Sequence, residues 1–390
     1  LVMKNKVIHI VLNTFEYDSR VIKECKTLAD LGLDVIVIAY HRKGLKYVEY
    51  SNGFKIIRLP LITINFSNNP IIQVFKYFEF FIKATFTILK VRPSICHGHD
   101  PSGLFVAYFS KIVLKTYLIY DSHELWGHTS HMKNYNRILY KFGGYFEKKI
   151  MRSCNAIITV NKSIAEKIKN NSLVEDIHII RNIPEYQNRK TNYTRDYLQL
   201  PNAKKIIIYV GSIAKGRGIE KLIYLMKKID KDIALAILGV EEKYKLDYEK
   251  YVFDNQLSSR IKFLDRVSPE DVVNVSSFAD LGIHPVENTC LNNYYCLPNK
   301  IFQYMHAGLP VVCSDFPEMK NIIENYGVGE VFNVDNIDDI VCSVNNVLCN
   351  SKKMEEYKKK SIKASKLLNW KNEEKILINI YSKYINDIYN

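Results

Sequence analysis

The sequence predicts an α/β protein with two doubly wound domains, and three observations support this fold class. Apolar strand-like runs alternate with amphipathic helical segments along nearly all 390 residues. A chain of this length exceeds what one compact core accommodates. A polar, proline-bounded stretch at 184–203 separates two strand–helix series. We therefore expect domains over residues 1–190 and 191–370, and a C-terminal helix over 371–390 that packs back on the first domain.

The beginning of the chain has the β-loop-α-β order that opens a doubly wound sheet. A strand at 7–12 and a loop at 13–18 are expected first, then a helix from Ser19 that Gly32 ends, and a strand at 35–39. The loop carries no GxGxxG sequence, which argues against a dinucleotide-binding site. Further strands of the first domain are expected at 94–97, 117–120, 156–160 and 177–180.

The second strand–helix series repeats this layout without a short-period sequence repeat. It begins with an apolar run at 206–210, and each later run is followed or preceded by a helical pattern. Short apolar runs of this kind are typical of strands buried in a parallel sheet. The later strands are expected at 234–238, 261–264, 281–283, 309–313 and 330–332.

The positive charge of the chain lies almost entirely in its first half. The formal net charge is +14; residues 1–200 hold 29 Lys and Arg against 16 Asp and Glu, whereas residues 201–390 hold 26 against 25. This asymmetry predicts an anionic partner for the first domain. No nucleic-acid recognition motif accompanies the charge, so we expect no nucleic-acid partner.

The segment 71–90 predicts a helix that is apolar except for one narrow stripe. Two interpretations remain open: a mostly buried helix of the first domain, or a face that enters a membrane surface while lysines meet anionic head groups. No uncharged apolar run reaches the length of a membrane span. The polar stripe consists of Gln73, Lys76, Glu79, Lys83, Thr87 and Lys90.

Cysteine usage and the N-terminal sequence predict a cytoplasmic protein. The eight cysteines show no CxxC and no paired zinc spacing, so we expect reduced thiols, most of them buried. No secretory signal precedes the first strand. We expect a cytoplasmic location, with the inner face of the cell membrane as a possible peripheral site.

Two strands of the first domain end in histidine and acidic residues. The first is followed by the HGHDP sequence and the second by DSHE, and both lie at the strand ends where α/β folds place their sites. A metal cluster is one interpretation, but no HExxH or i, i+4 histidine pair supports it, so we expect no metal. The histidines concerned are His97, His99, His123, His128 and His131.

A glycine turn in the second domain carries two cations next to a helix start. Residues 209–220, YVGSIAKGRGIE, predict a strand, then a turn with Lys215 and Arg217, then a helix. Free backbone N–H groups and the helix dipole attract anions at such a place. This loop is therefore a predicted phosphate site.

A second loop has the same character and organises the C-terminal half. In residues 290–315, Asn299 and Lys300 open a helix that Gly308 ends, and a buried strand follows. Asn, Lys and a helix N-terminus again converge on one point. Two anion sites at carboxyl ends of strands in one domain favour a diphosphate ligand.

The motifs resemble those of family 4 of the GT-B glycosyltransferases. YVGSIAKGRGIEKLI, PNKIFQYMHAGLPVV, DSRVIKECKTLADLG and HGHDPSG match that family in order and spacing over nearly the whole chain. The resemblance implies two Rossmann-like domains facing each other across a cleft, the C-terminal one binding a nucleotide-sugar and the N-terminal one the acceptor. It also implies transfer with retention and without a metal, in cell-surface polysaccharide biosynthesis with a glycan or lipid-linked glycan acceptor.

The resemblance carries roles to particular residues. Lys215 and Arg217 would bind the donor diphosphate and stabilise its charge as it leaves, and His99 would face the transferred sugar, so these three are the expected catalytic residues. The expected donor-binding residues are Gly211, Ser212, Lys215, Arg217, Glu287, Tyr295, Asn299, Lys300 and Gln303, and the expected acceptor-binding residues are Asp18, Arg20, Asp100, Asp121, His123 and Glu124.

The chain departs from the family pattern at three donor positions. Ser212 stands where many members have arginine, and Tyr295 and Gln303 stand where many have a pair of glutamates. A carboxylate accepts from both ribose hydroxyls, whereas an amide offers one uncharged acceptor oxygen. We expect Glu287, on a neighbouring loop, to replace the first acid. The departures leave two alternatives open beside a glycosyltransferase: a non-catalytic binding relative, and a nucleotide-sugar epimerase of similar fold, which the motifs disfavour.

Overall fold

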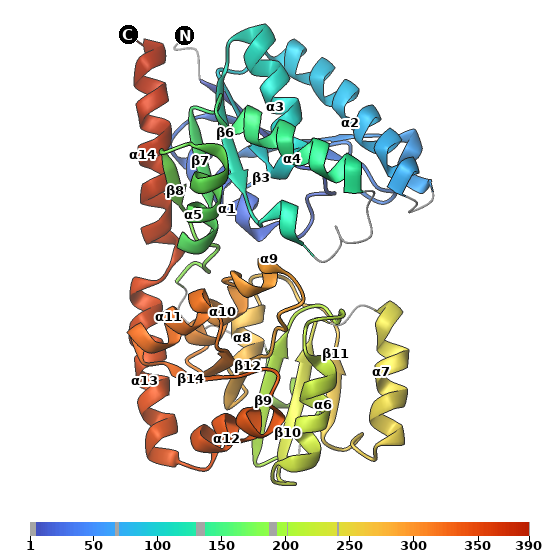
Figure 1. Ribbon diagram of the computed structural model, residues 1–390, viewed down its shortest axis with the longest axis vertical. Coiled ribbons are helices and arrows are strands. Elements are labelled where there is room, and N and C mark those ends of the chain that lie inside the picture. The colour runs from blue at the N-terminus through green and yellow to red at the C-terminus, as the bar shows by residue number, and fades with distance from the viewer. Residues whose placement is uncertain are drawn as a thin grey trace. The chain divides into compact units, whose positions relative to one another are not determined.

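The computed structural model describes residues 5–66, 70–129, 137–186, 193–200, 202–239 and 242–389. The chain forms two compact units (Figure 1). One comprises Leu1–Arg181 with Glu373–Asn390, and the other comprises Asn182–Asn372. Each unit is built on its own largely parallel sheet flanked by helices, which confirms the predicted two-domain α/β fold class.

The first unit contains an eight-stranded sheet in the order β3-β4-β2-β1-β5-β6-β7-β8. All neighbours pair in parallel except β3, which pairs antiparallel with β4. The central strands are buried on both faces, as their continuous apolar sequences require. The strands are β1 Lys6–Ile10, β2 Asp34–Tyr40, β3 Val48–Ser51, β4 Phe54–Leu59, β5 Ile95–His99, β6 Tyr117–Ser122, β7 Ala156–Thr159 and β8 Ile177–Ile179.

The β3–β4 hairpin was not expected from the sequence. Its turn is formed by Asn52 and Gly53, which both have positive φ angles of 50° and 82°. An Asn-Gly pair between two strands is a strong signal for such a turn, because both residues tolerate the left-handed region. The signal was present in the sequence, but β3 is short and half exposed, so its hydrophobic pattern is weak.

Helices connect these strands and cover the sheet (Figure 1). The Asp18 side chain accepts from the backbone N–H of Val21 and so caps the first helix, and Gly32 follows that helix with a φ of 85°. The helices are α1 Ser19–Asp30, α2 Pro70–Val91, α3 Asp100–Leu114, α4 Arg137–Met151, α5 Lys162–Ser172 and α14 Trp370–Tyr389, with the 3-10 turns η1 Ile62–Asn65 and η2 Trp126–His128.

Helix α2 is not mostly buried, which differs from one of the two interpretations of its sequence. Phe75, Phe78 and Phe86 are 59%, 62% and 70% exposed, and Val74 and Ile82 are exposed as well. Their spacing places them along one side of the helix. Only a narrower set, which includes Phe80 and Ile88, is buried.

The polar stripe of α2 is directed toward the protein rather than away from it. Glu79 accepts hydrogen bonds from the backbone N–H groups of Ile62 and Thr63 in η1. Lys83 donates to Glu79 at 2.7 Å, and the Lys76 ammonium lies 4.4 Å from the centre of the Tyr40 ring. Because these lysines are engaged within the unit, the outward face of α2 is aromatic rather than basic.

The C-terminal helix α14 packs against the first sheet. The hydroxyl of Tyr381 lies 2.9 Å from Nδ1 of His97 on β5, and the Tyr384 ring lies 5.0 Å from that of Tyr117 on β6. Both tyrosines are buried. Figure 1 shows this helix, in red, alongside β7 and β8.

The second unit contains a six-stranded parallel sheet in the order β11-β10-β9-β12-β13-β14. Its core consists of the strand interiors and the inward faces of the helices. The strands are β9 Lys205–Val210, β10 Ile233–Leu238, β11 Ile261–Leu264, β12 Leu281–His284, β13 Val311–Ser314 and β14 Gly329–Phe332. The helices are α6 Ile219–Lys228, α7 Glu242–Asp254, α8 Val272–Ser276, α9 Leu291–Tyr294, α10 Asn299–His306, α11 Pro317–Tyr326, α12 Ile337–Leu348 and α13 Ser351–Leu367, with the 3-10 turn η4 Arg195–Leu198.

The stretch 184–203 differs from the expected linker. Residues 187–192 lie outside the described residues, but Leu198 and Leu200 are buried in the core of the second unit. Polar composition and flanking prolines suggested an exposed segment, yet these two leucines anchor its second half to the sheet.

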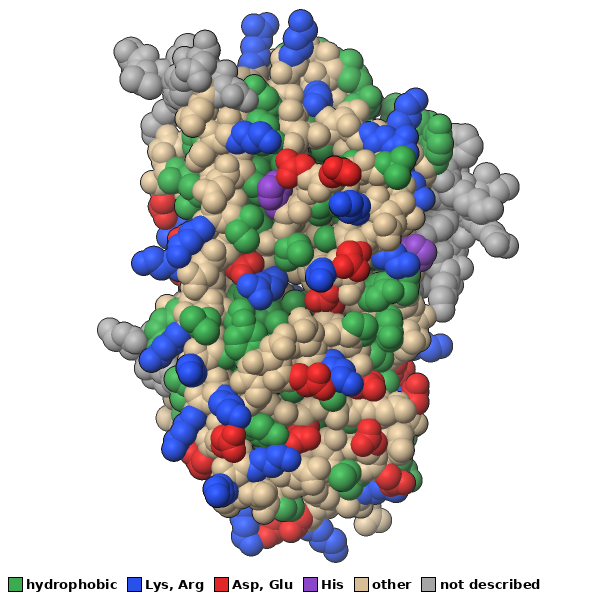
Figure 2. Space-filling model, turned by 60° about the vertical axis from the view of Figure 1, so that its left-hand side comes forward, with side chains coloured by type: hydrophobic (Ala, Val, Ile, Leu, Met, Phe, Trp, Pro, Cys, Tyr) green, Lys and Arg blue, Asp and Glu red, His purple; other side chains and the backbone are tan. Residues whose placement is uncertain are grey.

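Charge on the visible surface is mixed. In Figure 2, basic and acidic side chains are interspersed on the face shown, and hydrophobic side chains lie among them. Of the eight free cysteines only Cys25, Cys96 and Cys313 are buried, and Cys342 and Cys349 are exposed, so the expectation of mostly buried thiols is wrong. Among the described residues, no helix has the length and hydropathy that crossing a bilayer requires.

Candidate active site

The predicted phosphate loop of the second unit runs from the end of β9 to the start of α6. Gly211 follows β9 with a φ of 135°, and Gly218 precedes α6 with a φ of 74°. A Cβ on Gly218 would lie 2.0 Å from the carbonyl oxygen of Pro285. The backbone N–H of Glu287 also donates to the Gly216 carbonyl. Because only glycine fits at these positions, Gly216 and Gly218 allow the loop to pack against the segment that follows β12.

Lys300, at the start of α10, extends along this loop. A Cβ built on Gly211 would lie 2.3 Å from Cε of Lys300 and 3.0 Å from its Nζ. Burial, together with the positive charge of Arg217, lowers the pKa of Lys300 to about 8. The structure thus brings three predicted donor residues together: Gly211, Arg217 and Lys300. Because the charge of Arg217 acts on Lys300, the two cations suit an anion with more than one charge.

Tyr304 joins the strands on which this site is built. Its buried hydroxyl accepts from the backbone N–H of Val210 at 2.9 Å and donates to the carbonyl of Ile283 at 3.1 Å. The ring lies against Gly282, where a Cβ would be 2.3 Å from the ring carbons. Tyr304 therefore fixes α10, and with it Lys300, relative to the carboxyl ends of β9 and β12.

His284 belongs to the same site and was missed from the sequence. It ends β12, is fully buried, and lies 6.2 Å from the Tyr209 ring in a parallel arrangement. Burial holds its pKa well below the usual value, and Lys300 and Arg217 act in the same direction. Neither ring nitrogen has a hydrogen-bond partner among the described residues. Its position at a strand end was the available signal.

The remaining predicted donor residues surround this centre less closely. Lys215 is exposed in the loop, and the Ser212 carbonyl accepts from the Tyr209 hydroxyl. Glu287 lies 3.8 Å from the Lys221 ammonium. Three others lie on α9 or α10 or next to them and are partly buried: Tyr295, Asn299 and Gln303.

In the first unit, Arg20 and Asp121 form a buried ion pair. The guanidinium donates from Nε to Oδ2 at 2.7 Å and from Nη2 to Oδ1 at 2.9 Å, and Nη1 donates to the Ile180 carbonyl. Burial alone would raise the pKa of Asp121, but Arg20 and His123 hold it well below its usual range. Both residues were expected at an acceptor surface, whereas the structure buries them as a bidentate pair.

His99 lies inside β5 rather than in the loop after it. Its Nε2 is 2.9 Å from Nδ1 of His9, and its Nδ1 is 3.1 Å from Nε2 of His123 and 3.4 Å from the Asp121 carboxylate. The side chain is 2% exposed, and burial lowers its pKa although Asp121 opposes this. The ring is therefore neutral and held by its neighbours on both sides.

His123 and Asp100 form the outer part of this network. Asp100 accepts from the His123 backbone N–H at 3.1 Å and begins α3 with a φ of 54°. Burial alone would lower the pKa of His123, but Asp100 and Asp121 raise it to about 10. Glu124 is exposed, and Asp18 caps α1.

Two residues inside the network were missed from the sequence. His9 on β1 and Glu24 on α1 are fully buried beside His97 and His99. A histidine in an apolar strand and a glutamate in an amphipathic helix carry no local signal of such a cluster. Of the other predicted histidines, His128 lies in η2 outside the cluster, and His131 lies outside the described residues.

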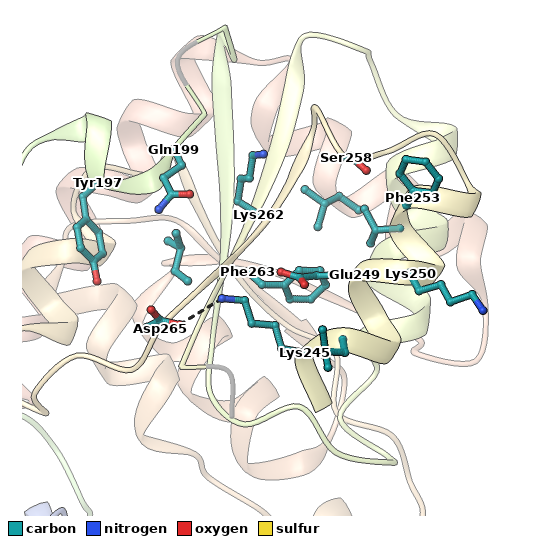
Figure 3. A pocket seen from close by; sticks show the side chains of 14 residues that line it. Tyr197, Gln199, Lys245, Glu249, Lys250, Phe253, Ser258, Lys262, Phe263 and Asp265 are labelled. Atoms are coloured by element: carbon teal, nitrogen blue, oxygen red, sulfur yellow. Dashed lines mark hydrogen bonds and ion pairs between the residues drawn. The ribbon is translucent and has the colours of Figure 1, made fainter. Parts of the chain in front are cut away.

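A cavity of about 680 Å³ lies elsewhere in the second unit, between β11, α7 and η4 (Figure 3). Figure 3 shows Lys245 directed toward Asp265, 3.4 Å away. The described residues that line the cavity include none of the predicted donor residues. This cavity is therefore separate from the site that contains Gly211, Arg217 and Lys300.

Two protein-family models match the chain. The model described as Glycosyltransferase Family 4 matches residues 19–183, and the one described as Glycosyl transferases group 1 matches residues 191–364. Together they cover both units and every predicted donor residue. No curated protein matches the chain in sequence.

Solved structures with the same fold cover the whole chain at low sequence identity. Sucrose-phosphate synthase from Thermosynechococcus elongatus has a TM-score of 0.81 at 17% identity, over 98% of this chain and 100% of that one. HepE of Anabaena with UDP-glucose has a TM-score of 0.74 at 13% identity, over 98% and 100%. WaaG, described as involved in lipopolysaccharide biosynthesis, has a TM-score of 0.68 at 14% identity, over 95% and 99%.

Proposed function

Because the chain is a glycosyltransferase of the GT-B class, whose two family models it matches over both units, we propose that it transfers a sugar from a nucleotide-sugar to a glycan or lipid-linked glycan acceptor. We further propose retention of anomeric configuration and a role in cell-surface polysaccharide synthesis. One observation carries the proposal: Lys300, at the start of α10, lies against Gly211 at the end of β9, and the charge of Arg217, before α6, acts on it.

The donor diphosphate is proposed to bind against Gly211 and the N-terminus of α10. Lys300 and Arg217 neutralise its charge, and Lys215 approaches from the exposed loop. As the bond to the sugar breaks, negative charge grows on the leaving phosphate, so fixed cations stabilise the transition state more than the ground state. No metal ion is required in this scheme, because the side-chain cations supply the positive charge.

The nucleoside and sugar parts of the donor are assigned to the remaining residues. Asn299 and Ser212 would donate to phosphate or sugar oxygens, and Tyr295, Gln303 and Glu287 would contact ribose or sugar hydroxyls. The HepE structure holds UDP-glucose, which makes uridine diphosphate sugars the first donors to test. The amide of Gln303 predicts weaker ribose binding than a carboxylate would give.

The acceptor is assigned to the first unit. His99, with Asp100 and His123, is proposed to lie next to the transferred sugar, and Asp18 and Glu124 to contact the acceptor. Arg20 and Asp121 would act by holding His99 and His123 in place, since the pair is buried.

We propose that α2 rests on the inner face of the cell membrane. Its outward face is aromatic, and the first half of the chain carries the excess of positive charge. Co-sedimentation with phosphatidylglycerol vesicles tests this. The Phe78→Ser/Phe86→Ser variant should bind less than the wild type, and a Leu246→Ser/Phe253→Ser variant of the second unit serves as the control. Equal loss in both variants, or none in either, would argue against the assignment.

Sugar transfer is tested by assaying donor hydrolysis and transfer with uridine, guanosine and adenosine diphosphate sugars. We expect turnover with one nucleotide class, and its loss in Arg217→Gln and Lys300→Gln. A protein that binds the donor without hydrolysing or transferring it would instead be a non-catalytic relative. Interconversion of free nucleotide-sugars without release of the nucleotide would indicate an epimerase.

A further inference from the structure

Three side chains of types that bind metal ions meet in the core of the first unit, next to His99. They have no part in the proposed sugar transfer. His9 on β1, His97 on β5 and Glu24 on α1 are fully buried, and one ligand atom of each lies within 4.8 Å of those of the others. The two imidazole rings are 4.6 Å apart. These residues come from three elements that the parallel pairing of β1 with β5 brings together.

Four buried polar atoms of these three side chains make no hydrogen bond among the described residues. Among the described residues, Nε2 of His9, Nε2 of His97 and both carboxylate oxygens of Glu24 have no hydrogen-bond partner. The Arg20 guanidinium lies 3.2 Å from Oε1 of Glu24 as an ion pair. Because Arg20 engages Oε1, three buried polar atoms are left unsatisfied, which is costly and rare in native cores. Something that binds these atoms is therefore expected between them.

The hydrogen bonds at Nδ1 of His9 and at Nδ1 of His97 indicate what kind of partner binds the two Nε2 atoms. Nδ1 of His99 lies 3.1 Å from Nε2 of His123 and 3.4 Å from the Asp121 carboxylate. When Nδ1 donates to that carboxylate, Nε2 of His99 accepts from Nδ1–H of His9. His9 then presents a lone pair at Nε2. Nδ1 of His97 is bonded to the Tyr381 hydroxyl at 2.9 Å. When that nitrogen donates, His97 also presents a lone pair at Nε2.

We propose that His9, His97 and Glu24 bind a divalent transition-metal ion of the zinc class in the core of the first unit. Two imidazole nitrogens and Oε2 of Glu24 supply three ligand atoms of types that zinc binds, while Arg20 engages Oε1. Imidazole favours zinc, copper, iron and nickel over magnesium and calcium. The outer bonds to His99 and Tyr381 are the kind that orient metal-bound histidines.

The ion would hold the protein together rather than take part in sugar transfer. Its ligands come from β1, β5 and α1, and the Tyr381 contact adds α14. Ligand atoms of a tetrahedral zinc ion lie about 3.4 Å apart, so the ligand atoms, which lie within 4.8 Å of one another, would move closer together on binding. This site does not depend on the proposed donor or acceptor.

Metal content of the purified full-length protein, measured by plasma mass spectrometry, tests the proposal. After expression and refolding with added zinc, we expect about one ion per chain and at least roughly tenfold less in Glu24→Gln. Glu147→Gln is the matched control, because Glu147 is another glutamate of this unit and bonds the Tyr120 hydroxyl. Wild-type protein with less than about a tenth of an ion per chain, or equal metal in wild type and Glu24→Gln, would overturn the proposal.

A second measurement on the wild type alone covers the case in which Glu24→Gln does not fold. Protein refolded with cobalt(II) should show the intense visible absorption of four-coordinate cobalt, and crystals should show anomalous density between His9 and His97. Absence of both, or density that a water molecule explains, would assign the space to water or a proton shared with Glu24 and overturn the proposal.

Discussion

The side chain of Lys300 occupies the space in which a side chain on Gly211 would lie. The built Cβ would be 2.3 Å from Cε of Lys300, and Gly211 has a φ of 135°, which side chains rarely permit. Gly211 of one anion loop and Lys300 of the other therefore pack directly against each other. Neither residue is expected to tolerate change without displacing the other.

Gly211→Ala should weaken nucleotide binding by displacing Lys300 and straining the backbone. We expect the dissociation constant of uridine diphosphate, measured by calorimetry, to rise by about tenfold or more, or ~1.4 kcal/mol. Gly143→Ala is the control, because a Cβ there meets nothing within 4 Å. Unchanged affinity in Gly211→Ala would place the diphosphate elsewhere.

The affinity for nucleoside diphosphate should fall as the pH rises through about 8. In the free protein the pKa of Lys300 is lowered to about 8 by burial and by Arg217. A bound diphosphate favours the charged amine, so binding takes up a proton and weakens above that pH. Titration calorimetry between about pH 7 and pH 9.5 measures the slope. Lys300→Arg stays charged and should lose the dependence. The same slope in both proteins would contradict the assignment.

Gln303→Glu should tighten nucleoside diphosphate binding. The carboxylate accepts from two ribose hydroxyls with charge assistance, whereas the amide has one uncharged acceptor oxygen. We expect a several-fold lower dissociation constant by calorimetry. Gln199→Glu, in the wall of the separate β11 cavity, is the control. No change, or weaker binding, would show that Gln303 does not meet the ribose.

Tyr304→Phe should destabilise the second unit. Removing the hydroxyl leaves the Val210 N–H and the Ile283 carbonyl without their partner in a fully buried place. The expected cost is about 1–3 kcal/mol in urea unfolding. Tyr357→Phe removes a hydroxyl that bonds Glu330 in a partly exposed place, so it should cost less. Equal costs would argue against the bridging role.

Breaking the Arg20–Asp121 pair one residue at a time should cost more than removing both. Either Arg20→Met or Asp121→Leu leaves an uncompensated buried charge, which we expect to destabilise the first unit by about 3–5 kcal/mol. The double variant should lose less than the sum of the two single losses, because neither member of the pair is then left without the other. Urea unfolding of the four proteins in a double-mutant cycle measures the coupling. Additive losses would show that the two side chains do not interact.

The sequence predicted the elements with the strongest patterns. The expected strands at 7–12, 206–210 and 261–264 are found as β1, β9 and β11, and the helix over 71–90 is found as α2. Boundaries shifted where polar residues continue a strand: His99 lies inside β5 because parallel pairing with β6 extends to Asp121. The face of α2 was not predictable, because Glu79 of its polar stripe found partners in η1 while Phe75, Phe78 and Phe86 stayed exposed.

The candidate site was predicted to different extents in the two units. Lys300 and Arg217 were predicted because glycines, lysines and helix starts leave a local pattern. His284, His9 and Glu24 were missed because each is one polar residue in an apolar element, and only the fold decides which others it meets. The mutual burial of Arg20 and Asp121, residues 101 positions apart, likewise has no sequence signal.

By itself the sequence determined the fold class, the two strand–helix series and the residues that open the two anion loops, because periodicity, glycines and helix starts are local properties of a chain. The tertiary structure alone decided that Lys300 lies against Gly211 and that His9, His97 and Glu24 converge. Those contacts depend on strand order and register, which bring together side chains far apart in the sequence.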